Sequence, residues 1–138
     1  MRILHSKWSF CFLYLFLGIG LSSAKASLVD SLWYEYHSLG DNAAKIETLV
    51  QISFLQFHDA DSVNYCLQKA DSLNQIVGSD ILAGRISEAY GILFGWYLDD
   101  FGLAKVCFEE SIDHFQNAKD EGSLAYAYDG LGSMLAEK

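Results

Sequence analysis

The stretch AYGILFGWYLDDFGLAKVCFEESI, residues 89–112, decides the fold of this chain. Apolar residues recur at three- and four-residue spacing on both sides of the acidic turn Asp99-Asp100, which is the pattern of two amphipathic helices. The first segment carries a glycine on its apolar face, and the second carries Ala104 and Phe108 four residues apart. The stretch therefore predicts a helical hairpin, with Ala104 where the two helices cross and Phe108 packing one turn later.

The same pattern occurs earlier in the chain and begins again later. The second helices of the two hairpins superpose at a constant offset of 41 residues along the chain. This offset pairs Val63, Leu67 and Ala70 with Ala104, Phe108 and Ser111. The first helices superpose at nearly the same offset, which aligns Gln51, Gly91 and Gly132. Two antiparallel helices repeated at this period indicate a solenoid of stacked hairpins, each burying its apolar face against its neighbours.

The chain has no proline, and its glycines lie mostly near the ends of the helical segments, so we expect an all-α fold. A leading helix is predicted in residues 27–41. The repeats are predicted in residues 42–138, as units 42–79, 80–122 and 123–138. The third unit is incomplete, because the partner of its first helix would follow Lys138. We therefore expect either the N-terminal part of a longer protein or a truncated product, and the alternative is that the last helix caps the stack itself.

Residues 1–26 have the pattern of an export signal. Arg2 and Lys7 precede an apolar run, residues 9–21, and the small residues of Ala24-Lys25-Ala26 follow it. The run is shorter than the roughly 20 residues that span a bilayer. Cleavage after the second of these alanines is the first choice, and a cut after the first alanine or an uncleaved anchor are the alternatives. We expect an exported protein in the periplasm or another extracytoplasmic location.

The charge of the mature chain excludes two classes of partner. Loss of Arg2, Lys7 and Lys25 leaves six of the nine bases against all 18 acids, which gives residues 27–138 a net charge of −12. Such a charge repels phosphate backbones and anionic lipid headgroups. We expect one domain that binds no nucleic acid and whose repeats make no contact with a membrane.

The second hairpin resembles the tetratricopeptide repeat, whose signature places Leu-Gly, an aromatic, alanine, an aromatic and alanine at points matched here by Tyr90-Gly91, Phe94, Phe101, Ala104, Phe108 and Ser111-Ile112. Leu131-Gly132 restarts the signature, whereas Gln51 and Leu67 depart from it in the first repeat. The resemblance implies a right-handed solenoid. A period of about 40 rather than 34 residues and the missing closing proline look like the exported sensor proteins of bacteria, in which such repeats precede a membrane helix and a kinase or DNA-binding output.

Catalytic and metal-binding motifs are missing from the sequence. No histidine has a second histidine or a cysteine at i, i+4 spacing, and His58-Asp59-Ala60-Asp61 lacks the glycine and distal glutamate of a calcium loop. No Gly-x-x-x-x-Gly-Lys occurs, and no serine or cysteine lies in a glycine-framed nucleophile turn. We therefore expect a protein that is not an enzyme and that has no cofactor and no metal.

The two cysteines of the mature chain occupy equivalent positions in successive hairpins. Helices pack about 8–10 Å apart, whereas a disulfide requires Cα atoms within about 7 Å. We expect Cys66 and Cys107 to be reduced and at least partly buried.

Function is then expected on the inner, concave side that the first helices line. The family pattern implies that the partner-binding residues are Lys45, Thr48, Ile52, Leu55 and Gln56 in the first repeat, Arg85, Glu88, Ile92, Gly95 and Trp96 in the second, and Tyr126, Asp129, Ser133 and Glu137 in the third. Trp96 is the predicted aromatic anchor for a peptide or helix. The alternative is that Trp96 only packs on the neighbouring repeat.

Taken together, these features predict an exported protein–protein interaction module that binds a protein or peptide, the sensing or scaffolding part of a bacterial signalling protein. Its membrane helix and output domain would lie beyond the present sequence. The alternatives are a helical subunit that attaches an extracytoplasmic enzyme or surface complex, and a truncated fragment with no independent function.

Overall fold

The computed structural model describes residues 23–136, and every regular element in that part of the chain is helical. A leading helix, residues 23–38, precedes α2 (Asn42–Leu55), α3 (Ala60–Val77), α4 (Asp80–Ile92), the π-helix η1 (Leu93–Tyr97), α5 (Phe101–Ala118) and α6 (Glu121–Ala136). The predicted all-α class is confirmed. Most of the predicted export signal, residues 1–22, lies outside the described residues.

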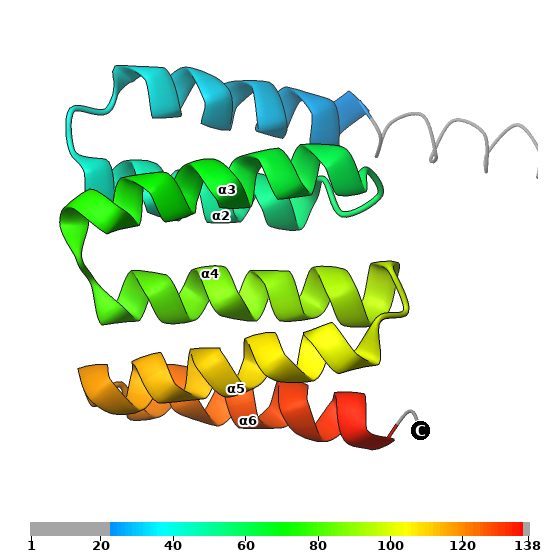
Figure 1. Cartoon of the computed structure of the whole chain (residues 1–138). Coiled ribbons are helices and arrows are strands. Elements are labelled where there is room, and N and C mark those ends of the chain that lie inside the picture. The colour runs from blue at the N-terminus through cyan, green and yellow to red at the C-terminus, as the bar shows by residue number, and fades with distance from the viewer. Residues whose placement is uncertain (1–22, 137–138) are drawn as a thin grey trace, which may run out of the picture.

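Figure 1 shows the helices stacked in chain order, from the leading helix at one end to α5 and α6 at the other. α2 packs mainly on α3 and α4 mainly on α5, and α6 packs mainly on α5. Each helix therefore contacts chiefly its neighbours in the sequence.

Short polar side chains fix where the helices begin. An N-cap oxygen accepts a hydrogen bond from a backbone N–H of the first turn and so satisfies a group that has no partner within the helix. The caps and their donors are Asp41 with Ala43, Asp59 with Ser62, Ser79 with Leu82, Asp100 with Leu103 and Asp120 with Ser123. α3 ends at Gly78, whose φ of 69° is left-handed and favours glycine.

The buried apolar side chains of residues 23–136 form one large cluster and two small ones. The large cluster joins buried side chains of the leading helix, α2, α3 and α4. The small clusters are centred on Phe108 and Phe115, and both join α5 to α6. Ala104 and Phe108 are buried together with Met134 of α6. Ala104 also lies close to the first helix of its predicted hairpin, since a Cβ added at Gly95 would be 3.2 Å from the Cβ of Ala104.

Glycines let α5 approach its neighbours closely. A Cβ added at Gly91 of α4 would lie 2.9 Å from the ring of Phe108, and one added at Gly130 of α6 would contact the same ring. A Cβ added at Gly84 would likewise lie 2.6 Å from the ring of Phe115. A Cβ at Gly132 would instead meet nothing within 4 Å. Phe108 is thus held between glycines of two helices, because a side chain at either position would displace it.

The π-helix at the end of α4 was not predicted. Its wider turn is closed by the N–H of Leu98, which donates to the carbonyl of Leu93 at 3.1 Å. The chain then turns at Asp99, whose φ of 53° is left-handed, before Asp100 caps α5. The π-turn places Trp96 at the end of the first helix of the second hairpin.

Candidate functional site

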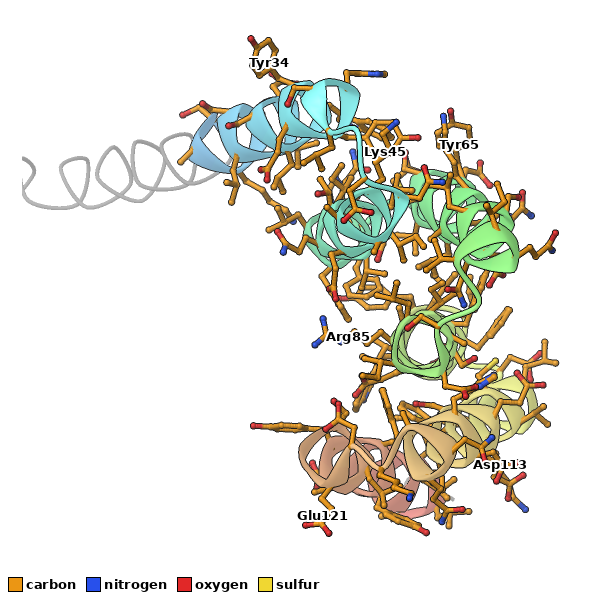
Figure 2. All side chains as sticks on the ribbon, turned by 90° about the vertical axis from the view of Figure 1, so that its left-hand side faces the viewer. Tyr34, Lys45, Tyr65, Arg85, Asp113 and Glu121 are labelled. Carbon is orange, nitrogen blue, oxygen red and sulfur yellow. The ribbon has the colours of Figure 1, made fainter. Side chains whose placement is uncertain are left out.

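The stack curves, and its inner side is lined by α2, α4 and α6. Figure 2 shows Arg85 pointing from α4 into the open side of this curve, whereas Asp113 of α5 points to the opposite, outer side. The leading helix and α6 lie at the two ends of the curve. We call the surface of α2, α4 and α6 on the side of Arg85 the inner face.

Four predicted residues of the second repeat share one side of α4 and η1. Arg85, Glu88, Ile92 and Trp96 follow one another at three- or four-residue spacing, as residues on one helix face do. Trp96 is 50% exposed, and Ile92 is half-buried against the cluster around Phe108. The prediction was wrong for Gly95, which is buried and faces Met134 and Ala104 rather than the groove.

An ion pair links α2 and α4 across this surface. The Nη1 atom of Arg85 on α4 donates to Oε2 of Glu47 on α2. A cavity of about 230 Å³ lies beside this pair, and it is lined by Glu47, Val50, Gln51, Phe54, Arg85 and Glu88. We call it the α2–α4 cavity.

Glu88 carries a half-buried carboxylate in this cavity. Burial raises the pKa of Glu88 above its ordinary value, and the nearby positive charge of Arg85 opposes part of this rise. Within the described part of the chain, no hydrogen bond reaches the Glu88 carboxylate, whose one electrostatic partner is Arg85. The cavity therefore holds two acids against one base, and only one of the acids is in direct contact with that base.

The predicted residues of the first repeat lie mostly on another side of α2. Ile52 is fully buried, and Thr48 is buried with its hydroxyl donating to the carbonyl of Ala44 at 3.0 Å. Lys45 lies over the ring of Tyr36 in the leading helix, 5.6 Å from the centroid. Thr48 and Ile52 thus belong to the core and do not face a partner. The reason is that the leading helix packs across the side of α2 on which Lys45 lies.

Leu55 and Gln56 contribute to a second cavity, of about 490 Å³, between the end of α2 and the leading helix. Its other lining residues are Lys25, Ala26, Val29, Asp30 and His58. Lys25 and Ala26 fall inside the predicted export signal. The predicted cleavage after Ala26, if it occurs, removes part of the wall of this cavity.

A one-residue change of register would have identified the correct side of α2. The offset that relates the second helices, applied to the first helices, pairs Glu47 with Glu88 and Gln51 with Ile92. The same offset pairs the buried Thr48 and Ile52 with the buried Ala89 and Leu93. The predicted alignment of Gln51 with Gly91 was wrong by one residue, since Gln51 is exposed and Gly91 is buried.

In α6, the predicted residues lie at the surface but are not gathered with Trp96. Tyr126 is 74% exposed, Asp129 is exposed and Ser133 is half-buried. Among the described residues, no ring contact joins Tyr126 to Trp96. Glu137 lies outside the described residues. The α2–α4 cavity therefore joins Arg85 and Glu88 to residues of α2 that were not predicted, and its lining contains none of the predicted residues of the first or third repeat.

An aromatic surface that was not predicted continues from the α2–α4 cavity. The ring of Phe54, which is 40% exposed, meets Phe57 edge-on at 5.3 Å, and Phe57 stacks on Tyr97 at 4.8 Å. Tyr97 and Leu98 are both exposed and directly follow Trp96 in the chain. Residues 54, 57, 97 and 98 form what we call the aromatic end, and Trp96 directly precedes it in the chain. Apolar side chains left exposed together are typical of surfaces that bind another protein.

The described residues contain no group of three or more histidine, cysteine or acidic side chains that could hold a metal ion. Cys66 and Cys107 are free thiols. No helix between residues 23 and 136 combines the length and hydropathy needed to cross a membrane. Comparison with protein-family models, with curated proteins and with solved structures finds no match to the chain.

Proposed function

We propose that the chain is an exported, non-catalytic protein–protein interaction module that binds a peptide or helix on its inner face. The repeats are proposed to form a right-handed solenoid of the tetratricopeptide type, with a period of about 40 residues that is longer than the usual one. In this proposal the module is the N-terminal sensing or scaffolding part of a bacterial signalling protein and works outside the cytoplasm.

The observation that carries the proposal is the exposure of Trp96 on the same surface as the α2–α4 cavity. A half-exposed tryptophan on the same side of α4 and η1 as Arg85 and Glu88 offers an apolar anchor near a charged cavity. Tryptophan is among the residues that contribute most to binding energy at protein interfaces. Trp96 belongs to none of the core clusters of the described residues, and half of its side chain is exposed.

The aromatic photocrosslinking residue p-benzoylphenylalanine, placed at position 96, keeps a large apolar ring at the proposed anchor and tests the proposal in cells that export the protein. We expect position 96 to give a defined adduct with another protein, and position 113 on the outer side to give none (Figure 2). Leu98→Asp, which changes the exposed aromatic end without touching position 96, should reduce the adduct. Equal labelling from positions 96 and 113 would reject binding on the inner face.

Export is tested separately by the N-terminus of the protein outside the cytoplasmic membrane. Mass spectrometry should find a chain that begins at Ser27, or at Lys25 for the earlier cut. A chain that begins at Met1 and stays in the cytosol would reject export.

A further inference from the structure

The α2–α4 cavity has the size of a pocket for one side chain. Its volume of about 230 Å³ is below the roughly 300–1,000 Å³ of pockets that bind small molecules. The cavity opens on the inner face, where Arg85 projects (Figure 2). An occupant would therefore be one residue of a bound chain, and the charge and walls of the cavity indicate which kind.

The charges of the cavity favour a cation. Arg85 is paired with Glu47, which leaves the carboxylate of Glu88 without a direct partner among the described residues. The three charged groups sum to one negative charge, and a carboxylate or phosphate from a partner would meet Glu47 and Glu88 as it approached Arg85. An ammonium or guanidinium group would instead pair with Glu88, and the acidic mature chain would attract it.

The walls of the cavity suit the stem of a long basic side chain. Phe54 exposes part of its ring on one side, and Val50 and the methylene groups of Gln51 lie on the same helix. Lysine and arginine bury their apolar stems against such surfaces and keep the charged group in a polar position. An aromatic ring near the charge adds a further attraction.

We propose that the α2–α4 cavity binds a lysine or arginine side chain of the partner, through the Glu88 carboxylate and the ring of Phe54. This inference rests on the proposed function, because it names the chemistry of the partner that the inner face would bind. The partner segment would then carry a basic residue for this cavity and an apolar residue for Trp96 and the aromatic end.

The test is an NMR titration of the isotope-labelled protein with N-acetyl-lysine methylamide. We expect saturable shifts of the side-chain amide of Gln51 and of the backbone amides of Phe54 and Glu88. N-acetyl-arginine methylamide should act in the same way. N-acetyl-norleucine methylamide, which lacks the charge, and N-acetyl-glutamate methylamide should cause no such shifts.

Glu88→Gln should lower the affinity for the lysine probe about tenfold, as expected when a charge-assisted hydrogen bond is lost. Glu109→Gln, which removes the same charge from an exposed position of α5, should leave the affinity unchanged. If the Glu88 variant folds poorly, Gln51→Lys keeps the test decisive, because its own lysine would fill the cavity and abolish binding. Asn117→Lys, exposed on α5, is the matched control.

Equal shifts with the norleucine probe would overturn the inference in favour of an apolar pocket, and larger shifts with the glutamate probe would make Arg85 the binding group. Equal affinities in the Glu88 and Glu109 variants would also overturn it. Crosslinking from position 96 without a preference for cations would reject this pocket while supporting the proposed function. A preference for cationic probes without crosslinking from position 96 would support this pocket and reject the proposed function.

Discussion

The two cysteines show how burial controls the chemistry of single residues. Burial raises the pKa of Cys66 to about 11, and burial together with the Glu110 carboxylate raises the pKa of Cys107 to about 11. The thiolate is the reactive form, so a rise of this size from 9.0 makes it about 100-fold scarcer below pH 9. Neither thiol is suited to nucleophilic catalysis at neutral pH.

We predict that both thiols react with iodoacetamide far more slowly in the folded protein at pH 8 than in the denatured chain. Cys107 is half-buried and should react faster than the buried Cys66. Mass spectrometry at successive times checks this order. Since the pKa values rise on folding, the thiols should also make the protein less stable as the pH increases from about 9 to 11. Native rates equal to denatured rates would contradict the burial of these side chains.

At the scale of the helix, α6 contains two glycines whose replacement should have opposite effects. A Cβ at Gly130 would contact the ring of Phe108, whereas one at Gly132 would meet open space. We predict that Gly130→Ala lowers the free energy of unfolding by about 1–3 kcal/mol through overpacking. Gly132→Ala should raise it by about 0.5–1 kcal/mol, because alanine is the better helix former.

Chemical denaturation followed by circular dichroism measures both effects. The two variants add the same methyl group two residues apart, so each is the control for the other. A loss of stability in both would mean that something covers Gly132, such as a second copy of the chain, and a concentration series would detect it. A gain in both would show that α6 does not pack on Phe108.

The sequence predicted where the helices lie along the chain better than it predicted which faces of the helices pack together. Apolar spacing and capping residues identify α2 to α6, and the positions of Ala104 and Phe108 follow from the repeat. The side of α2 that faces the groove did not follow, because an error of a single residue in the offset rotates a helix by about 100°. Nothing in the repeat pattern predicts where the leading helix packs.

Only the α4 residues of the α2–α4 cavity could be predicted from the sequence. Arg85 and Glu88 follow from the spacing of α4, but their neighbours Glu47 and Phe54 depend on the register of α2. The aromatic end depends on the π-turn at residues 93–97, which brings Tyr97 against Phe57. A π-turn has no clear signal in one sequence, since the same residues also fit an α-helix.

At the scale of the molecule, contacts between sequence neighbours imply that stability varies along the stack. The large core cluster joins the leading helix to α4, whereas α6 is held by two small clusters. Elements with few buried contacts open with lower free energies than the core of the same protein. Repeat proteins with neighbour-only packing often lose their end units first.

We predict that the backbone amides of α6 exchange with deuterium faster than those of α4 under native conditions. Hydrogen exchange resolved by residue or by short peptides measures the difference. The internal comparison is α3, whose buried residues belong to the large cluster and which should exchange as slowly as α4. Uniform exchange along the chain would show a single cooperative unit in place of a gradient.

The position of Phe108 between Gly91 and Gly130 also affects the geometry of the inner face. One ring sets the spacing of α4 and α6, so its size determines how sharply the stack bends at that point. A smaller residue there would let the two helices approach and would change the distance between the inner surfaces of the second and third repeats. Evolution could therefore adjust the shape of the groove to a new partner by substituting a residue that no partner touches.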